Sequence, residues 1–143
     1  MRDIALATVL AILLAAAVAI VAACWWLRPV LRIEILRSTA VVHTELMGEY
    51  PTDLESIEVR EEKSDKLVWR AVADGGMFQM HSVALSIGEN DTQPSVYWGK
   101  VRAIKPSDSS SFVLESDTPY LVRVCSSFYI SLCNSEALAW PAR

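Results

Sequence analysis

Few side chains of this sequence could carry out chemistry. Its 143 residues include two histidines, His43 and His81, and three cysteines. A zinc site needs three or four ligands at recognisable spacing, and the sequence contains neither Cys-x-x-Cys nor His-Glu-x-x-His. It also lacks the nucleophile elbow Gly-x-Ser-x-Gly, the phosphate-binding loop and the dinucleotide-binding glycine motif. We therefore predict that the protein is not an enzyme and has no catalytic residue, no cofactor and no metal.

The other titratable groups are interpreted as structural or solvated. We expect His43 on the packing stripe of a helix and His81 in the middle of a strand. Residues 58–66 mix carboxylates with lysines, which is typical of a charged connector rather than of a general acid/base pair. Glu89 and Asp91 offer too few ligands for calcium, which takes about six to eight oxygens.

Cys125 and Cys133 follow the apolar N-terminal segment. On one continuous strand they would lie about 26 Å apart, and a tight turn at 126–127 would also keep them from meeting. A disulfide forms only if residues 126–132 make the loop between two strands, and it would then contribute about 2.5 kcal/mol. The alternative is two small buried apolar side chains.

The N-terminal segment is long enough to cross a lipid bilayer. From residue 4 to residue 27 there are 24 consecutive positions without a charged side chain. At about 1.5 Å per residue this length crosses a hydrocarbon core of about 30 Å. Trp25, Trp26 and Arg28 form the aromatic and basic fringe expected at the lipid headgroups. We predict a transmembrane anchor over residues 1–28.

The end of this segment also resembles a bacterial lipobox. Residues 21–24 have its small-residue pattern, in which Cys24 would be lipidated and become the new N-terminus. A cleaved signal peptide is a further alternative, although its apolar region is usually only about 7–15 residues long. An uncleaved span is the favoured interpretation.

Small residues form a row along the predicted span. Alanine recurs at every fourth position, at Ala7, Ala11, Ala15, Ala19 and Ala23. Such a row lets another helix approach closely, although alanine fills nine of the 24 positions and chance is the alternative explanation. The row predicts other transmembrane helices, or subunits of a membrane complex, as partners.

Two observations disagree about the orientation in the membrane. Arg2 alone precedes the span whereas Arg28, Arg32 and Arg37 follow it, and the positive-inside rule then favours a cytoplasmic C-terminal part. The cysteine pair favours an oxidising compartment. We prefer the second argument, which predicts a periplasmic or other extracytoplasmic domain on a bacterial inner membrane.

Beyond the span the periodicity of apolar residues changes. Residues 30–47 place them at steps of three and four, which predicts a juxtamembrane amphipathic helix over 29–48. A capping box at 52–55 predicts a short helix. After residue 66 the period is two, and strands are expected at 67–73 and 77–87 as a hairpin, then at 96–104, 112–116 and 120–133. The fold class is therefore α+β, with five or six antiparallel strands packed on the amphipathic helix.

The soluble part is acidic. After Gly48 there are nine basic and fourteen acidic residues, which gives a net charge of −5. We expect no basic stripe for nucleic acid or anionic lipid, and therefore no nucleic-acid partner.

Two further patterns concern surface positions. Asn90-Asp91-Thr92 fits the N-glycosylation pattern within a polar loop predicted over 88–95. Trp69, Tyr97 and Trp98 are expected in core or cross-strand packing, with an exposed aromatic patch for a partner as the alternative.

The order of these parts resembles a type IV pilin or pseudopilin. The similarity lies in a hydrophobic helix running into an amphipathic one, an antiparallel sheet, a late cysteine pair and the turn Gly48-Glu49-Tyr50-Pro51-Thr52-Asp53-Leu54. The basic leader ending in glycine is missing before Ile4, and the span contains no glutamate. The resemblance therefore implies the architecture, but neither leader processing nor polymerisation into a fibre.

These features predict a non-catalytic single-pass membrane protein with three parts: an anchor (1–28), a juxtamembrane helix (29–48) and a small β-rich domain (49–143). We expect an accessory, scaffold or assembly subunit of a larger membrane protein complex. The alternatives are a membrane-anchored lipoprotein or recognition module, lipidated at Cys24, and a pilin-like fibre component.

Overall fold

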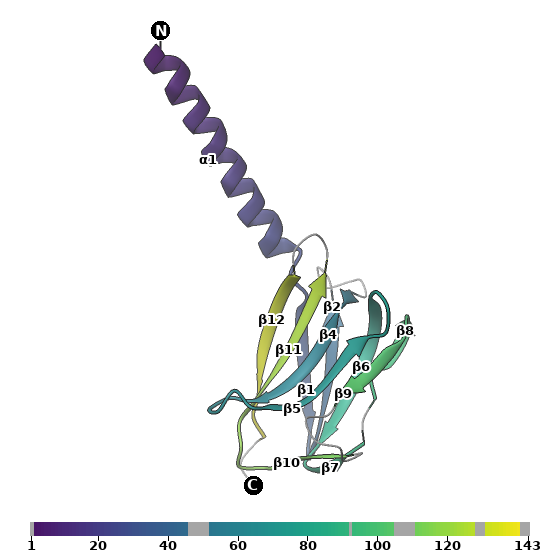
Figure 1. Cartoon of the computed structure of the whole chain (residues 1–143). Coiled ribbons are helices and arrows are strands. Elements are labelled where there is room, and N and C mark those ends of the chain that lie inside the picture. The colour runs from purple at the N-terminus through teal and green to yellow at the C-terminus, as the bar shows by residue number, and fades with distance from the viewer. Residues whose placement is uncertain (1, 46–51, 92, 105–110, 128–130, 141–143) are drawn as a thin grey trace.

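A computed structural model of the chain has one N-terminal helix followed by a domain of β-strands (Figure 1). The residues that it describes are 2–45, 52–91, 93–104, 111–127 and 131–140. The predicted combination of an apolar N-terminal helix with antiparallel sheets is confirmed.

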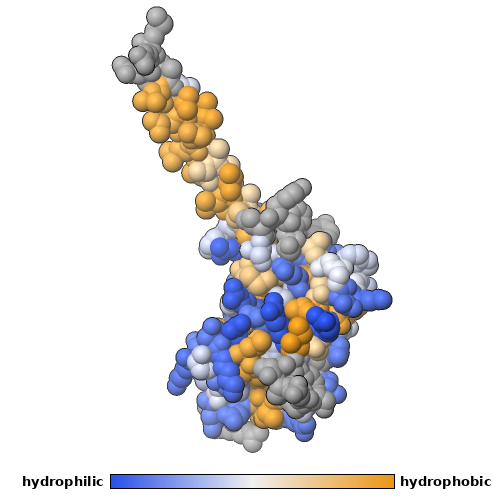
Figure 2. All heavy atoms as spheres, in the orientation of Figure 1, coloured by the Kyte–Doolittle hydropathy of each residue, from blue (hydrophilic) through white to orange (hydrophobic). Residues whose placement is uncertain are grey.

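Helix α1 (Arg2–Trp26) extends away from the β domain (Figure 1). Alanine and leucine dominate it and are strong helix formers. The helix ends before Pro29, which lacks a backbone N–H and disfavours helical geometry in the residue before it. Residues Leu6–Trp26 form a candidate membrane span in which no residue is buried against the rest of the chain. Figure 2 shows this helix as a largely hydrophobic rod.

Residues 30–45 form a β-hairpin, so the amphipathic helix predicted over 29–48 is wrong for this part, and residues 46–48 lie outside the described ones. Strand β1 (Val30–Leu36) pairs antiparallel with β2 (Thr39–Glu45). The predicted stripe combined residues from both faces of this hairpin: Ala40 is fully buried, whereas Leu36 is 65% exposed. The many β-branched residues of the segment favour strands over a helix.

The strands form two five-stranded sheets and one small sheet, and every pairing is antiparallel. The first sheet contains β1 and β2 together with β3 (Asp53–Leu54), β6 (Phe78–Ser86) and β8 (Ser95–Trp98). Its strand order is β1-β2-β6-β3, and β8 also pairs with β6. The second has the order β12-β11-β4-β5-β9, formed by β4 (Ser56–Glu61), β5 (Leu67–Ala73), β9 (Val101–Ile104), β11 (Tyr120–Ser127) and β12 (Ser131–Leu138). The small sheet pairs β7 (Gly88–Asn90) with β10 (Phe112–Leu114).

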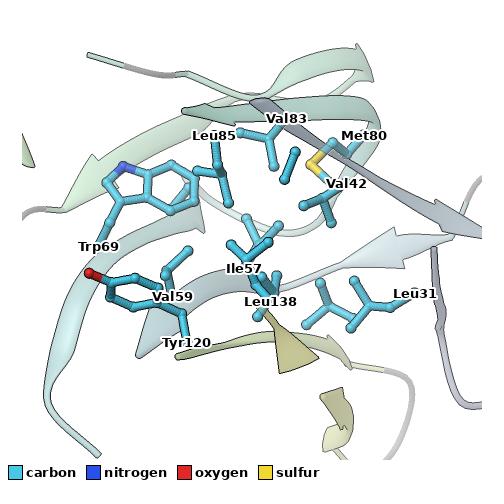
Figure 3. Close-up of a cluster of buried hydrophobic side chains, with 14 of the residues drawn as sticks. Leu31, Val42, Ile57, Val59, Trp69, Met80, Val83, Leu85, Tyr120 and Leu138 are labelled. Carbon is cyan, nitrogen blue, oxygen red and sulfur yellow. The ribbon is translucent and has the colours of Figure 1, made fainter. Parts of the chain in front are cut away.

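The two large sheets enclose one hydrophobic core (Figure 3). Ile57 and Val59 from the second sheet and Val42 and Leu85 from the first are fully buried. Trp69 is also fully buried and stacks on Phe112, with ring centroids 5.8 Å apart. Residues 6–26 of α1 contribute no buried residue to this core.

Strand β5 lies where the sequence predicts it, but its predicted hairpin with residues 77–87 is wrong. Strand β5 pairs with β4 and β9, whereas β6 belongs to the opposite sheet. The Asp74-Gly75-Gly76 segment therefore links the two sheets, and Gly75 and Gly76 take positive φ values of 82° and 121° there.

Further predictions of secondary structure are corrected. Residues 52–55 contain β3 instead of a helical cap, because burial of Leu54 in the core outweighs the local capping signal. The polar loop over 88–95 contains β7, and the strand over 96–104 divides at Gly99 into β8 and β9 of different sheets. The described residues thus hold twelve strands instead of five or six.

Candidate interaction surfaces

The alanine row lies on the exposed surface of α1. Ala7, Ala11, Ala15, Ala19 and Ala23 are all solvent-exposed in the isolated chain. Because an α-helix has about 3.6 residues per turn, each four-residue step advances the row by about 40°. The row therefore runs obliquely across the helix surface, and its small side chains would let a second helix approach α1 closely at an angle.

The helix meets the β domain at an aromatic and basic junction. Trp25 and Trp26 are 71% and 65% exposed, and the Arg28 guanidinium carbon lies 5.3 Å from the Trp25 ring centroid. The side-chain amide of Asn134 donates a hydrogen bond to the Pro29 carbonyl at 3.0 Å, which ties β12 to the connection below the helix. These contacts place the three predicted interface residues together at the end of α1.

A disulfide joins Cys125 and Cys133, one of the two outcomes that the sequence left open. The two residues lie directly opposite each other on β11 and β12, with their Cα atoms 4.1 Å apart. The connection is shorter than the predicted loop over 126–132, because β11 continues to Ser127 and β12 begins at Ser131. Cys24 remains a free thiol near the end of α1.

A buried carboxylate lies at the centre of the second sheet, and no pattern in the sequence indicated it. The side chain of Glu58 is 7% exposed, although residues 58–66 were predicted as a solvated connector. Arg60 Nε donates to Glu58 Oε1 at 2.9 Å, and Arg70 and Arg123 each lie 3.8 Å from the same carboxylate. The hydrogen bond to Glu58 is the main cause that raises the pKa of the Arg60 guanidinium above its ordinary value.

These arginines were invisible as a group in the sequence because three strands contribute them. Glu58 is opposite Arg70 on β5 and opposite Arg123 on β11. The separation from Arg60 to Arg123 along the chain conceals this arrangement, and only the strand register reveals it. The net negative charge of the soluble part therefore does not describe this face of the second sheet, where three arginines surround one carboxylate.

The aromatic residues divide between the core and the surface. Trp69 is fully buried, as one of the two interpretations requires, whereas Tyr97 and Trp98 on β8 are 58% and 60% exposed. His81, on the neighbouring β6, is exposed and its ring contacts that of Tyr97. Strand β8 pairs with β6 alone among the described strands, so these aromatic side chains mark an open edge of the first sheet.

The remaining candidate residues do not converge. His43 lies half-buried on β2, in a strand rather than on a helix. Among the described residues there is no group of three or more His, Cys, Asp or Glu side chains that could hold a metal ion.

Asn90 is not an exposed acceptor. It is buried, and its amide nitrogen donates to the carbonyls of Ser86 and Gly88 while its amide oxygen accepts from Ser86 N. These hydrogen bonds of the Asn90 side chain stabilise the connection between β6 and β7. A structural role therefore explains this asparagine better than glycosylation does. Thr92 of that pattern lies outside the described residues.

Comparisons with known proteins give no relative for this chain. No family model, no curated protein and no solved structure matches it.

Proposed function

We propose that the chain is a non-catalytic, single-pass membrane protein that acts as an accessory, scaffold or assembly subunit of a larger membrane protein complex. In this proposal α1 crosses a bacterial inner membrane and the β domain lies on its periplasmic side.

One observation carries the proposal: no residue from Leu6 to Trp26 of the apolar helix is buried, and the buried core residues of the described chain all lie from Leu31 onward. Burial of apolar surface is the main stabilising contribution in folding, at about 25 cal/mol per Å². Because the β domain does not cover the apolar surface of α1, we expect lipid and neighbouring helices to cover it. The exposed alanine row gives one side of α1 small side chains, which permit a close helix contact.

The disulfide supports the periplasmic location. Disulfides persist in oxidising compartments and are rare in the cytosol. Cys125 and Cys133 are aligned by the β11–β12 register, so an oxidising environment would close this bond without rearrangement of the strands. The three arginines after the span argue for the opposite orientation.

A substitution in the alanine row tests the lateral contact. The variant Ala11→Leu/Ala15→Leu/Ala19→Leu adds volume along the row while keeping the span apolar. The matched control, Ala5→Leu/Ala16→Leu/Ala17→Leu, adds the same volume outside the row. We expect the row variant to insert normally but to lose its co-purifying membrane subunits, and the control to keep them. Equal recovery of subunits with both variants would contradict the contact.

The lipoprotein alternative predicts a different mature chain. Lipidation at Cys24 would follow cleavage before this residue and would remove nearly all of α1. The intact mass of the membrane-extracted protein distinguishes this lipidated chain from the uncleaved one, because the proposal requires an unmodified Cys24 within the span. The pilin-like alternative would instead require polymers of this chain, which size analysis of the same extract detects.

A further inference from the structure

Four arginines occupy one face of the second sheet. Arg60, Arg70 and Arg123 surround Glu58, and Arg102 on β9 is opposite Val72, which is two residues beyond Arg70 on the same face of β5. The opposite face of this sheet carries the buried core residues Ile57, Val59 and Trp69. Alternation along the strands therefore points all four arginines away from the core.

This face is positively charged within an acidic chain. Glu58 is the one acidic residue among its described strand positions, and Asp65 approaches Arg60 from the adjoining turn at 3.4 Å. Four positive charges thus face two negative ones, whereas the whole chain has a formal net charge of −4. The fold has separated the charges and left an excess of +2 here.

The arginines keep donors available after binding Glu58. Each guanidinium has five N–H donors, and the side chains of Arg70 and Arg123 are 40% and 46% exposed. Arg102 is exposed, and no ion pair joins it to another residue in the described part of the chain. Figure 2 shows hydrophilic atoms over this side of the domain, interspersed with hydrophobic ones.

We propose that this arginine face, formed by Arg60, Arg70, Arg102 and Arg123, binds an acidic segment of a neighbouring protein in the membrane complex. The inference rests on the proposed function and specifies its partner. Carboxylates fit because Glu58 already accepts a hydrogen bond from Arg60 at this place, and arginine guanidinium groups can bind carboxylates through two parallel hydrogen bonds.

The direction of the face favours a protein neighbour over the bilayer. In Figure 1 the strands of the second sheet run towards the end of α1, so that the sheet presents its face sideways from the helix. A subunit beside this chain would meet the face, whereas the lipid surface around α1 would meet the ends of the strands. Complementary charges between this face and a partner would increase the specificity of binding and the rate of association.

Peptide binding to the full-length protein tests the inference. The protein is placed in nanodiscs of phosphatidylcholine, and the probe is a fluorescent peptide of eight glutamates, with eight glutamines as its neutral control. The variant Arg102→Gln/Arg123→Gln leaves Arg60 and Arg70 to hold Glu58. The matched control, Arg32→Gln/Arg37→Gln, removes the same charge from the β1–β2 hairpin, with Arg32 on β1 and Arg37 in its turn.

We expect salt-sensitive binding of the glutamate peptide, weakened about fivefold or more in the face variant and unchanged in the control. Arg102→Lys/Arg123→Lys keeps the charges and is expected to retain most of the affinity, which separates loss of charge from loss of fold. Equal affinity of Arg102→Gln/Arg123→Gln and Arg32→Gln/Arg37→Gln for the glutamate peptide would overturn the inference. So would stronger binding to phosphatidylglycerol vesicles than to the peptide.

Co-purification keeps this inference distinct from the proposed function. If the wild-type chain elutes with membrane subunits and the face variant retains them in the same ratio, the arginine face is not the contact and the proposed function stands. If the wild-type chain elutes alone, the proposed function itself fails.

Discussion

Glu58 lies directly opposite Arg123 on neighbouring strands, with Oε1 of the carboxylate 3.8 Å from Nη1 of the guanidinium. The same carboxylate accepts a hydrogen bond from Arg60 and faces Arg70 on the other neighbouring strand. One buried charge therefore connects three strands in the middle of the second sheet.

Replacement of this carboxylate should destabilise the sheet. We expect Glu58→Gln to lower the free energy of unfolding by about 1–3 kcal/mol, because three arginines lose their common counter-charge. The effect is measured by urea unfolding in detergent. Asp65→Asn is the control: its side chain is 81% exposed, and its loss should cost at most about 1 kcal/mol. Equal effects of the two substitutions would contradict a central role for Glu58.

The pH dependence of this contact follows from the raised pKa of Arg60. A group whose pKa is raised by folding contributes its full stabilisation below its unfolded pKa and loses it only as pH rises through the folded value. We expect the Arg60 contribution, measured as the difference between wild type and Arg60→Gln, to stay constant from about pH 7 to pH 10. A decline of the Arg60 contribution between about pH 7 and pH 10 would contradict the raised pKa of this guanidinium.

The disulfide should stabilise the β domain. Cys125→Ser/Cys133→Ser removes a short covalent ring, whose closure contributes about 2.5 kcal/mol on the loop-entropy model. Unfolding with and without reductant measures this difference in the wild type, and the double variant should not respond to reductant. Cys24→Ser should behave like the wild type. Alkylation of Cys125 and Cys133 in protein isolated without reductant, which would give three alkylated thiols with Cys24 instead of one, would refute the bond.

Gly99 should tolerate no side chain. Its φ is +88°, and a Cβ atom there would lie 2.6 Å from the Met77 carbonyl oxygen and 2.9 Å from Phe78 Cα. We expect Gly99→Ala to cost about 2 kcal/mol or more, because backbone strain adds to a clash with main-chain atoms. Gly75→Ala is matched in φ, at +82°, but has open space around the new atom, and should cost only about 1 kcal/mol. A smaller loss at Gly99 than at Gly75 would contradict this packing.

The sequence predicted the features that depend on neighbouring residues. The uncharged stretch before Leu27 identified the helix, and the period of two identified β5 at Leu67–Ala73. The hairpin at residues 30–45 was missed because Ala40 and Leu36 fit a helical spacing while facing opposite sides of a strand pair.

Features that depend on strand pairing could not be predicted. Strands β5 and β6 are adjacent in the sequence, but they pair in different sheets. The disulfide needed the β11–β12 register, and the arginine face needed four strands to align. Glu58 is buried although its segment is charged, because β4 is the central strand of the second sheet. The periodicity of the sequence alone does not predict this position.

The most direct test of the account is to extract native membranes in mild detergent, capture the full-length protein by a C-terminal tag, and analyse the eluate by size and mass spectrometry. We predict that an unmodified chain of 15.8 kDa elutes with defined membrane subunits in a fixed ratio. Elution of this chain alone would contradict its role as a subunit, and a diacylglyceryl mass on Cys24 would identify an anchored lipoprotein instead.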